Sequence, residues 1–243
     1  MTQAQKWLGD NYPLLNREYI TKLDISKKKL ENHLQLKGFT NLKELELSDN
    51  EITSLEIVNC PHLGEINGVR NKLIKIDIKG CPQLKNLWVY SNLLTNLDLS
   101  QNSKLEELNI DNNNFSEQDL SFLSHLKNLK KLWVGNNIEW RIKQGIYNHF
   151  AGSLEFLKDM EQLEWCDISN TDVDRGLEYL PKRVENFRCL NNYRPNAKVQ
   201  VLNKLLEKEK SDRFSQELEI YKQKIQIKAQ VQQANLMNFS KEV

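Results

Sequence analysis

The chain has 243 residues, with 34 lysines and arginines against 33 aspartates and glutamates, for a formal net charge of +1. That length allows one large or two modest domains, and the balanced, interspersed charge argues against a nucleic-acid binder, which needs clustered basic side chains. The N-terminal residues lack the apolar segment of a secretory signal, and no apolar run approaches the ~20 residues that span a bilayer. We therefore expect no secretory signal and a cytoplasmic, reduced protein without a membrane partner.

Residues 1–19 precede the repetitive part of the chain and predict a capping helix. Its segment TQAQKWLGDNYPLL carries Trp7, Leu8 and Tyr12, which we expect to cover the first coil. A repetitive fold needs such a cap because each repeat contacts only its neighbours and the terminal repeats would otherwise expose their core.

A repeat of about 21 residues begins at residue 20. In a copy such as LKELELSDNEI, Leu45 and Leu47 alternate with Glu46 and Ser48, which is the periodicity of a strand with one buried face. Consecutive copies start 22, 21, 21, 21, 24, 34 and 21 residues apart. The copies start at Ile20, Leu42, Leu63, Leu84, Leu105, Leu129, Leu163 and Val184.

On the recurring frame LxxLxLxxNxL, residues 20–195 resemble the leucine-rich-repeat superfamily, with short coils similar to those of fungal members. The resemblance implies an α/β fold, a right-handed solenoid whose parallel concave sheet has about eight strands, with a helical N-cap and a C-terminal helix. We expect three parts: a cap at 1–19, a solenoid at 20–195 and a C-terminal helix and tail at 196–243.

The asparagine of each frame is expected inside the solenoid, because a side-chain amide can satisfy buried peptide groups in neighbouring coils. Thr171 and Lys28 replace it in two coils, and Gly68 stands at a core leucine position. The predicted ladder consists of Asn50, Asn71, Asn92, Asn113, Asn137 and Asn192.

The return half of each regular coil is too short for a full helix, and alternation such as Leu55, Glu56, Ile57 predicts an extended or 3₁₀ segment. The longer stretches 113–128 and 138–162 have room for a short helix each. In the second stretch, Ser153 is expected to cap a helix over LEFLKDM, and Phe150, Leu154, Phe156 and Leu157 to dock on the solenoid.

The four cysteines are interpreted as core residues. Cys60 and Cys81 occupy the same inward position of adjacent coils, and Cys166 and Cys189 occupy strand positions. No CxxC pair is present, so we expect no metal site. Stacking of adjacent coils would bring Cys60 and Cys81 within disulfide range, but a reducing compartment would keep them as thiols.

After the solenoid, Val199, Leu202, Leu205 and Leu206 have helical spacing and predict a helix that covers the last coil. Further on, Phe214, Leu218, Tyr221 and Ile225 form a short heptad seam, and we expect helix to about residue 232. Pairing of this helix with that of a second copy would give a weak homodimer.

No enzymatic signature is evident. The four histidines fall in different coils, none expected to share a strand face with a nucleophile, and phosphate-binding glycine motifs are absent. We therefore expect no catalytic residue, no cofactor and no metal, and a protein that is not an enzyme.

The outward positions of the strands carry large aromatic residues. In the middle outward column, Trp88 and Trp133 lie two strands apart, with Tyr90 beside the first. Indoles are enriched where binding energy concentrates, although they could instead pack as satellite core. The residues expected to contact a partner are Glu46, Trp88, Tyr90, Asn109, Asp111, Trp133, Trp165 and Asp167.

These features predict a non-enzymatic module that binds a protein or an extended peptide on the concave strand face, since small molecules need a deep pocket. Acidic flanks favour a partner with basic or hydroxyl groups. Two alternatives stay open: a self-associating adaptor that pairs through the C-terminal helix, and a regulatory fragment of a larger enzyme.

Overall fold

The computed structural model describes residues 1–208 of the chain. It divides into two units, Met1–Val201 and Leu202–Val243, and the description below concerns the first. In the second unit, residues 202–208 continue a helical run that begins at residue 200, in which Leu202 is buried and Leu205 is exposed. The predicted heptad seam from Phe214 and the helix to residue 232 lie outside the described residues.

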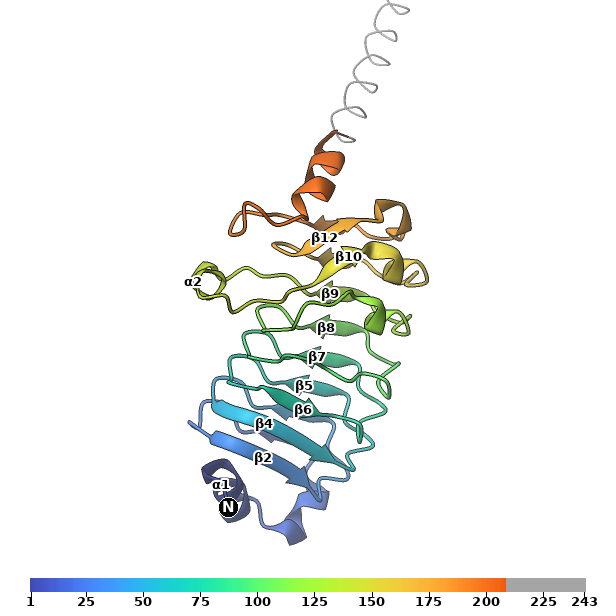
Figure 1. Cartoon of the computed structure of the whole chain (residues 1–243). Helices are drawn as coiled ribbons and strands as arrows, with labels where there is room; N and C mark the ends of the chain where they lie inside the picture. The colour runs from blue at the N-terminus through green and yellow to red at the C-terminus, as the bar shows by residue number, and fades with distance from the viewer. Residues whose placement is uncertain (209–243) are drawn as a thin grey trace, which may run out of the picture. The chain divides into compact units, whose positions relative to one another are not determined.

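The first unit is a stack of coils built on one parallel sheet of eight strands (Figure 1). Each strand has only three residues, and its central side chain points inward, as the repeat frame predicts. In spatial order the strands are β1 (Lys22–Asp24), β3 (Glu44–Glu46), β5 (Glu65–Asn67), β7 (Asn86–Trp88), β8 (Glu107–Asn109), β9 (Lys131–Trp133), β11 (Trp165–Asp167) and β13 (Asn186–Arg188).

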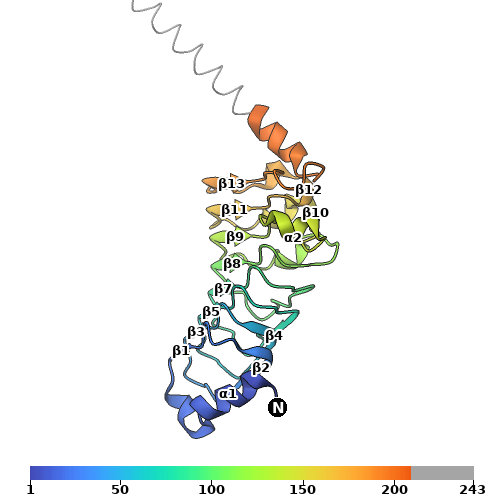
Figure 2. The same ribbon diagram turned by 90° about the vertical axis from the view of Figure 1, so that its left-hand side faces the viewer.

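The return halves of the coils form the opposite side of the stack, as Figure 2 shows. Three coils return as extended strands that pair in parallel, which confirms the predicted extended segments: β2 (Glu31–Lys37), β4 (Glu51–Val58) and β6 (Lys75–Asp77). The return segment that holds Leu97 and Leu99 buries both side chains without forming a strand. A second pair, β10 (Ala151–Ser153) and β12 (Asp172–Arg175), extends this side.

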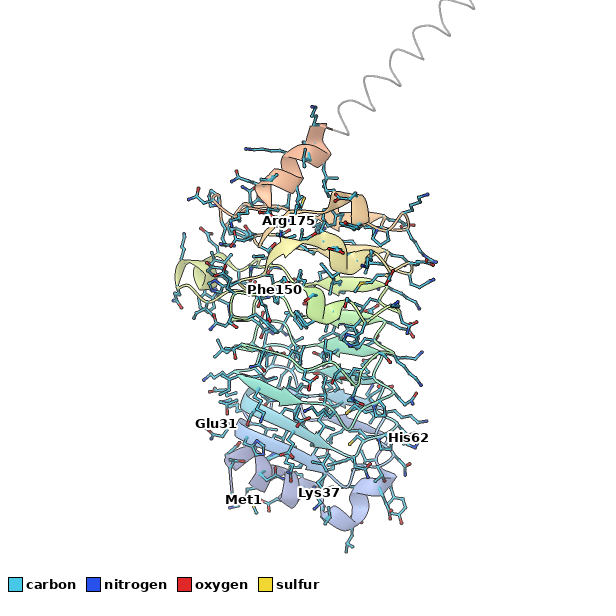
Figure 3. The ribbon with its side chains drawn as sticks, turned by 45° about the vertical axis from the view of Figure 1, so that its right-hand side comes forward. Met1, Glu31, Lys37, His62, Phe150 and Arg175 are labelled. Atoms are coloured by element: carbon cyan, nitrogen blue, oxygen red, sulfur yellow. The ribbon has the colours of Figure 1, made fainter. Side chains whose placement is uncertain are left out.

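Short helical elements fill the longer coils, as the spacing predicts. They are the 3₁₀ helices η2 (Ser121–Leu123) and η3 (Leu154–Leu157), and the helix α2 (Glu139–Lys143). A further 3₁₀ helix, η4 (Leu177–Tyr179), lies in the coil that begins at Leu163, outside the two stretches predicted to hold a helix. Ser153 does cap η3, because its hydroxyl accepts from the Glu155 N–H at 3.1 Å. The element after it is a four-residue 3₁₀ helix instead of a helix over LEFLKDM. The predicted docking of Phe150, which Figure 3 labels, is confirmed by its complete burial.

The N-terminal cap is the helix α1 (Gln3–Asn11), followed by the 3₁₀ helix η1 (Leu14–Tyr19). It lies against the edge strand β2, whose ends Glu31 and Lys37 are labelled in Figure 3. Two glutamine side chains of α1 satisfy N–H groups of that edge: Gln3 accepts from Glu31 at 2.9 Å and Gln5 from Gln35 at 2.8 Å. The cap therefore covers a row of unpaired peptide groups as well as the core under Leu8.

An asparagine ladder runs through the interior where the coils are regular. Asn92 is typical: its Nδ2 donates to the carbonyls of Gly68 and Val89 at 2.9 and 3.0 Å, and its Oδ1 accepts from the Leu73 N–H at 3.0 Å. One side chain thus ties three backbone segments together. The same pattern recurs at Asn50, Asn71 and Asn113.

The ladder prediction is wrong at Asn137 and Asn192, which are exposed. Asn148 fills the next position instead. Its Nδ2 donates to the Ile110 carbonyl at 2.9 Å, its Oδ1 accepts from the Phe115 N–H at 3.5 Å, and it is fully buried. The chain leaves the coil after Asn136 and returns at Asn148, so residues 137–147 form an outward excursion that includes α2.

The four cysteines are buried, as the repeat frame predicts for core positions. Burial raises the pKa of the Cys60 thiol to about 11 and that of the Cys81 thiol to about 12. These thiols contribute apolar packing, because a thiolate would have to form in a low-dielectric interior.

Candidate functional site

The outward side chains of the eight-stranded sheet form a surface that we call the strand face. Strand pairing keeps them in register, so they align as columns that cross the sheet. The middle column reads Asp24, Glu46, Asn67, Trp88, Asn109, Trp133, Asp167 and Arg188. The preceding column runs from Lys22 to Asn186, and the following one from Ser26 to Leu190.

Trp88 and Trp133 lie on the strand face with Asn109 between them, as the repeat frame predicts. Two strand spacings separate their backbones by about 10 Å. Both indoles are half-buried, and Tyr90, two residues beyond Trp88, is half-buried as well. Each of the two tryptophans keeps part of its surface in water, where it can contact a partner.

Trp165 joins this aromatic group from the preceding column. Its ring centroid lies 6.1 Å from that of Trp133, and the Arg188 guanidinium lies 4.8 Å above the Trp165 ring. The stack therefore crosses β9, β11 and β13. Arg188 was not among the predicted contact residues, although its place in the middle column could have revealed it.

The prediction that Asp111 and Asp167 flank the aromatics as exposed acids is wrong. They are 3% and 8% exposed. Gly135, between their strands, has no side chain to separate them, and a Cβ there would lie 3.1 Å from the Asp167 Oδ1. The Asp167 side chain lies against its own backbone, where its Oδ1 accepts a hydrogen bond from the Ser169 N–H at 2.9 Å.

The remaining predicted site residues have partners within the strand face. Glu46 accepts from the Asn67 Nδ2 at 2.6 Å, and the Asn109 Oδ1 accepts from the Asp111 N–H at 3.1 Å. In the column before them, Lys131 pairs with Glu107 at 2.7 Å. These contacts satisfy the polar side chains without a partner molecule.

The excursion 137–147 borders the strand face on the side of Asp111. The Asn137 Nδ2 lies 3.4 Å from the Asp111 Oδ2, and Asn137 also exchanges hydrogen bonds with Asn112. Arg141 anchors the excursion by donating to the Asn92 carbonyl. Trp140, on α2 of the excursion, is 58% exposed.

One histidine does share a strand face with a hydroxyl, contrary to the prediction. On the return side, His33 of β2 lies beside Ser54 of β4, with Nδ1 and Oγ 2.8 Å apart, and its Nε2 lies 3.9 Å from Glu56. These side chains stand on an open sheet, and Glu56 also accepts from Gln35 at 3.0 Å. Catalytic use of a serine and a histidine requires positioned oxyanion donors in a water-excluded site, and parallel pairing already engages the backbone here.

A hollow of about 680 Å³ lies outside the strand face, between residues that include His125, Phe156 and Arg175. Its ammonium groups already have partners, since Lys127 pairs with Asp159 at 3.2 Å and Lys158 with Glu155 at 3.4 Å. Among residues 1–208, no group of three or more His, Cys, Asp or Glu side chains is placed to hold a metal ion. In the same part of the chain, no helix is long and apolar enough to cross a membrane.

Short parallel strands that recur about every 21 residues, joined by an interior asparagine ladder, define a leucine-rich-repeat solenoid, and the chain folds as one. No protein-family model matches the chain, and no curated protein matches it by sequence at a significant level.

Solved structures with a similar fold are leucine-rich-repeat proteins. Internalin C2 from Listeria monocytogenes is 18% identical with a TM-score of 0.48, over 71% of this chain and 81% of that one. The internalin InlF from the same species is 17% identical with a TM-score of 0.46, over 72% and 62%. The plant peptide hormone receptor RGFR1, solved in complex with RGF2, is 22% identical with a TM-score of 0.45, over 68% and 34%. Identities of this size concern the fold alone.

Proposed function

We propose that this protein is a non-enzymatic, cytoplasmic module that binds a protein or an extended peptide on the concave strand face of the solenoid. The observation that carries the proposal is the outward, half-buried placement of Trp88 and Trp133 in one column of the sheet. Burying a large side chain contributes about 2–3 kcal/mol. Folding buries only part of each indole, so contact with a partner can bury the rest.

The shape of the strand face favours a polypeptide over a small molecule. The face crosses eight strands, or roughly 35 Å at the usual strand spacing. It is a broad surface, whereas small ligands bind in enclosed pockets. Trp165 and Tyr90 extend the aromatic area to adjoining columns, so an extended segment that crosses the strands would meet several anchors.

Selection of displayed peptides on the full chain tests the proposal. A random peptide library gives binders, and one binder is then titrated against the wild type, the double variant Trp88→Ala, Trp133→Ala, and the control Trp7→Ala in the N-terminal cap. We expect the double variant to bind at least 30-fold more weakly, since central aromatic anchors contribute about 2 kcal/mol or more, and the control to bind like the wild type. The melting temperature of the double variant should fall by only a few degrees.

Equal binding by all three proteins would place the binding surface elsewhere and contradict the proposal. A double variant that fails to fold would assign the indoles to the core instead. Denaturant unfolding, followed by circular dichroism, separates these two outcomes.

Self-association is a second candidate function, favoured by the exposure of Leu205 in the helical residues 202–208. The exposed apolar side chains of two such helices could pair. Light scattering on the wild type and on Leu205→Glu tests it: a dimer mass that the variant reduces to the monomer supports self-association, and equal monomer masses contradict it.

A further inference from the structure

Two buried acids meet on the strand face with no basic partner. Asp111 lies two residues beyond Asn109 on β8, Asp167 is the register partner of Trp133 on β11, and Gly135 lies between them. None of the ion pairs within residues 1–208 includes either aspartate. Two basic side chains on adjoining strands of the face are engaged: Lys131 pairs with Glu107, and Arg188, the register partner of Asp167, stacks on Trp165.

Asp111 is the less satisfied of the two acids. Its Oδ1 is buried without a hydrogen-bond partner in the described part of the chain. Its Oδ2 has the Asn137 amide at 3.4 Å, close to the limit of a hydrogen bond, and the Gly135 N–H also acts on the carboxyl group and partly offsets the effect of burial. Burial, and after it the nearby charge of Asp167, raises the pKa of Asp111 well above its ordinary value. A buried carboxyl oxygen without a partner costs free energy and needs an explanation.

Aromatic rings complete the surroundings of this acid pair. Trp133 is the direct neighbour of Asp167 across the sheet, and Trp165 lies 6.1 Å from Trp133. A cation within about 6 Å of an indole is attracted by the ring, and a carboxylate adds charge-assisted hydrogen bonds. An indole beside carboxylates therefore suits a positively charged group that can donate hydrogen bonds and that lies at the end of a long apolar side chain.

We propose that Asp111, Asp167 and the indole of Trp133 form a seat for the charged end of a lysine or arginine side chain of the bound polypeptide. This inference rests on the proposed function and names the chemistry of its partner. The incoming cation takes the place of the Asn137 amide, which is an exposed side chain on the excursion and a weak partner of Asp111. The unpartnered Oδ1 then gains a donor.

Peptide selection on matched variants tests the seat. The same random library is selected on the wild type, on Asp111→Asn and on Asp77→Asn, a control of identical chemistry on β6 of the return side. We expect wild-type and control binders to share a lysine or arginine at one position, and Asp111→Asn binders to lack this preference. Both variants keep the shape of the side chain that they replace, and their melting temperatures verify folding.

A double-mutant cycle then measures the contact itself. In one selected peptide the shared basic residue is replaced by norleucine, which keeps the stem and removes the charge. Binding to the wild type should fall at least tenfold, while binding to Asp111→Asn should change less than twofold.

The outcomes separate the seat from the proposed function. Wild-type binders that need Trp88 and Trp133 but show no basic preference would overturn the seat alone, as would equal losses in both arms of the cycle. A wild-type selection without binders would overturn both.

Discussion

The side-chain amides of Asn113 and Asn148 donate to the same carbonyl oxygen, that of Ile110, at 3.0 and 2.9 Å. They are 35 residues apart in the sequence, yet they are consecutive members of the interior ladder. The ladder therefore continues across the 34-residue spacing between Leu129 and Leu163, because the chain leaves the coil after Asn136 and re-enters it at Asn148.

Alanine substitutions should distinguish the buried ladder residue Asn148 from Asn137, which the repeat frame places in the ladder but which is exposed. Asn148→Ala removes the side-chain partner of the Val134 carbonyl and of the Phe115 N–H, whereas the Ile110 and Gly135 carbonyls keep other donors. We therefore expect a loss of roughly 2–4 kcal/mol in the free energy of unfolding, at about 1–3 kcal/mol per unsatisfied group. Asn137→Ala, at the position that the repeat frame designates, should cost less, about 0.5–1.5 kcal/mol, because its exposed side chain accepts one hydrogen bond, from the Asn112 Nδ2 at 2.8 Å. Urea denaturation measures both, and an equal loss in the two variants would contradict the assignment.

Asp111→Asn should stabilise the protein in a pH-dependent way. Burial raises the pKa of Asp111 in the folded state above the ordinary value of 3.8. Below that value the carboxyl is protonated in both states, so it contributes no pH dependence. As the pH rises, the unfolded chain releases the proton first and the wild type loses stability until the folded carboxyl also ionises.

The advantage of Asp111→Asn over the wild type should therefore grow from about pH 4 upward and be largest at neutral pH. Thermal melting of both proteins from pH 3 to pH 8 checks this, with Asp77→Asn as the control. A constant difference in melting temperature between Asp111→Asn and the wild type across this range would show that folding does not raise the pKa of Asp111.

Gly135→Ala should destabilise the protein and disturb the acid pair. A Cβ at this position would lie 2.8 Å from the carbonyl oxygen of Ser169 and 2.9 Å from its amide nitrogen. These are backbone atoms, so they cannot move away as a flexible side chain could. We expect a loss of about 1–3 kcal/mol, typical of overpacking. Gly9→Ala is the matched control: no atom lies within 4 Å of the added Cβ, and alanine in a helix should add about 0.5–1 kcal/mol. Opposite signs in urea denaturation are expected.

The thiols should be unreactive in the folded protein. Burial raises the pKa of Cys60 and Cys81 to about 11 and 12, and that of Cys166 above its ordinary value. Because the thiolate is the reactive form, a disulfide reagent at pH 8 should label no cysteine rapidly in the native state and all four after unfolding. Fewer than four labelled thiols without reductant would indicate a disulfide and contradict the cytoplasmic proposal.

Much of the fold follows from the sequence because the repeat frame fixes which side chains face inward. Leu45 and Leu47 predict a strand, and the regular spacing predicts its neighbours. The ladder prediction is wrong at Asn137 because two asparagines, Asn136 and Asn137, follow one another there. The repeat frame alone does not show which of the two side chains points inward. Asn148 lies outside any frame, so periodicity gave no signal for it.

The sequence predicts which side chains of the site point outward, but it does not predict how deeply each of them is buried. The alternation of each strand places Trp88 and Trp133 outward without knowledge of the structure. The burial of Asp111 and Asp167 depends on packing across three strands and on the missing side chain of Gly135. Such cross-strand effects are tertiary, and composition or spacing within one strand does not encode them.

Paramagnetic broadening locates a bound peptide most directly. A nitroxide is attached to Asn86→Cys on the strand face, or to Lys75→Cys on the return side, and the native thiols stay unlabelled because they are buried. With a ¹⁵N-labelled selected peptide at saturation, the account predicts strong broadening from the label at 86 and none from the label at 75. Broadening from position 75 alone, or none from 86, would contradict recognition on the strand face.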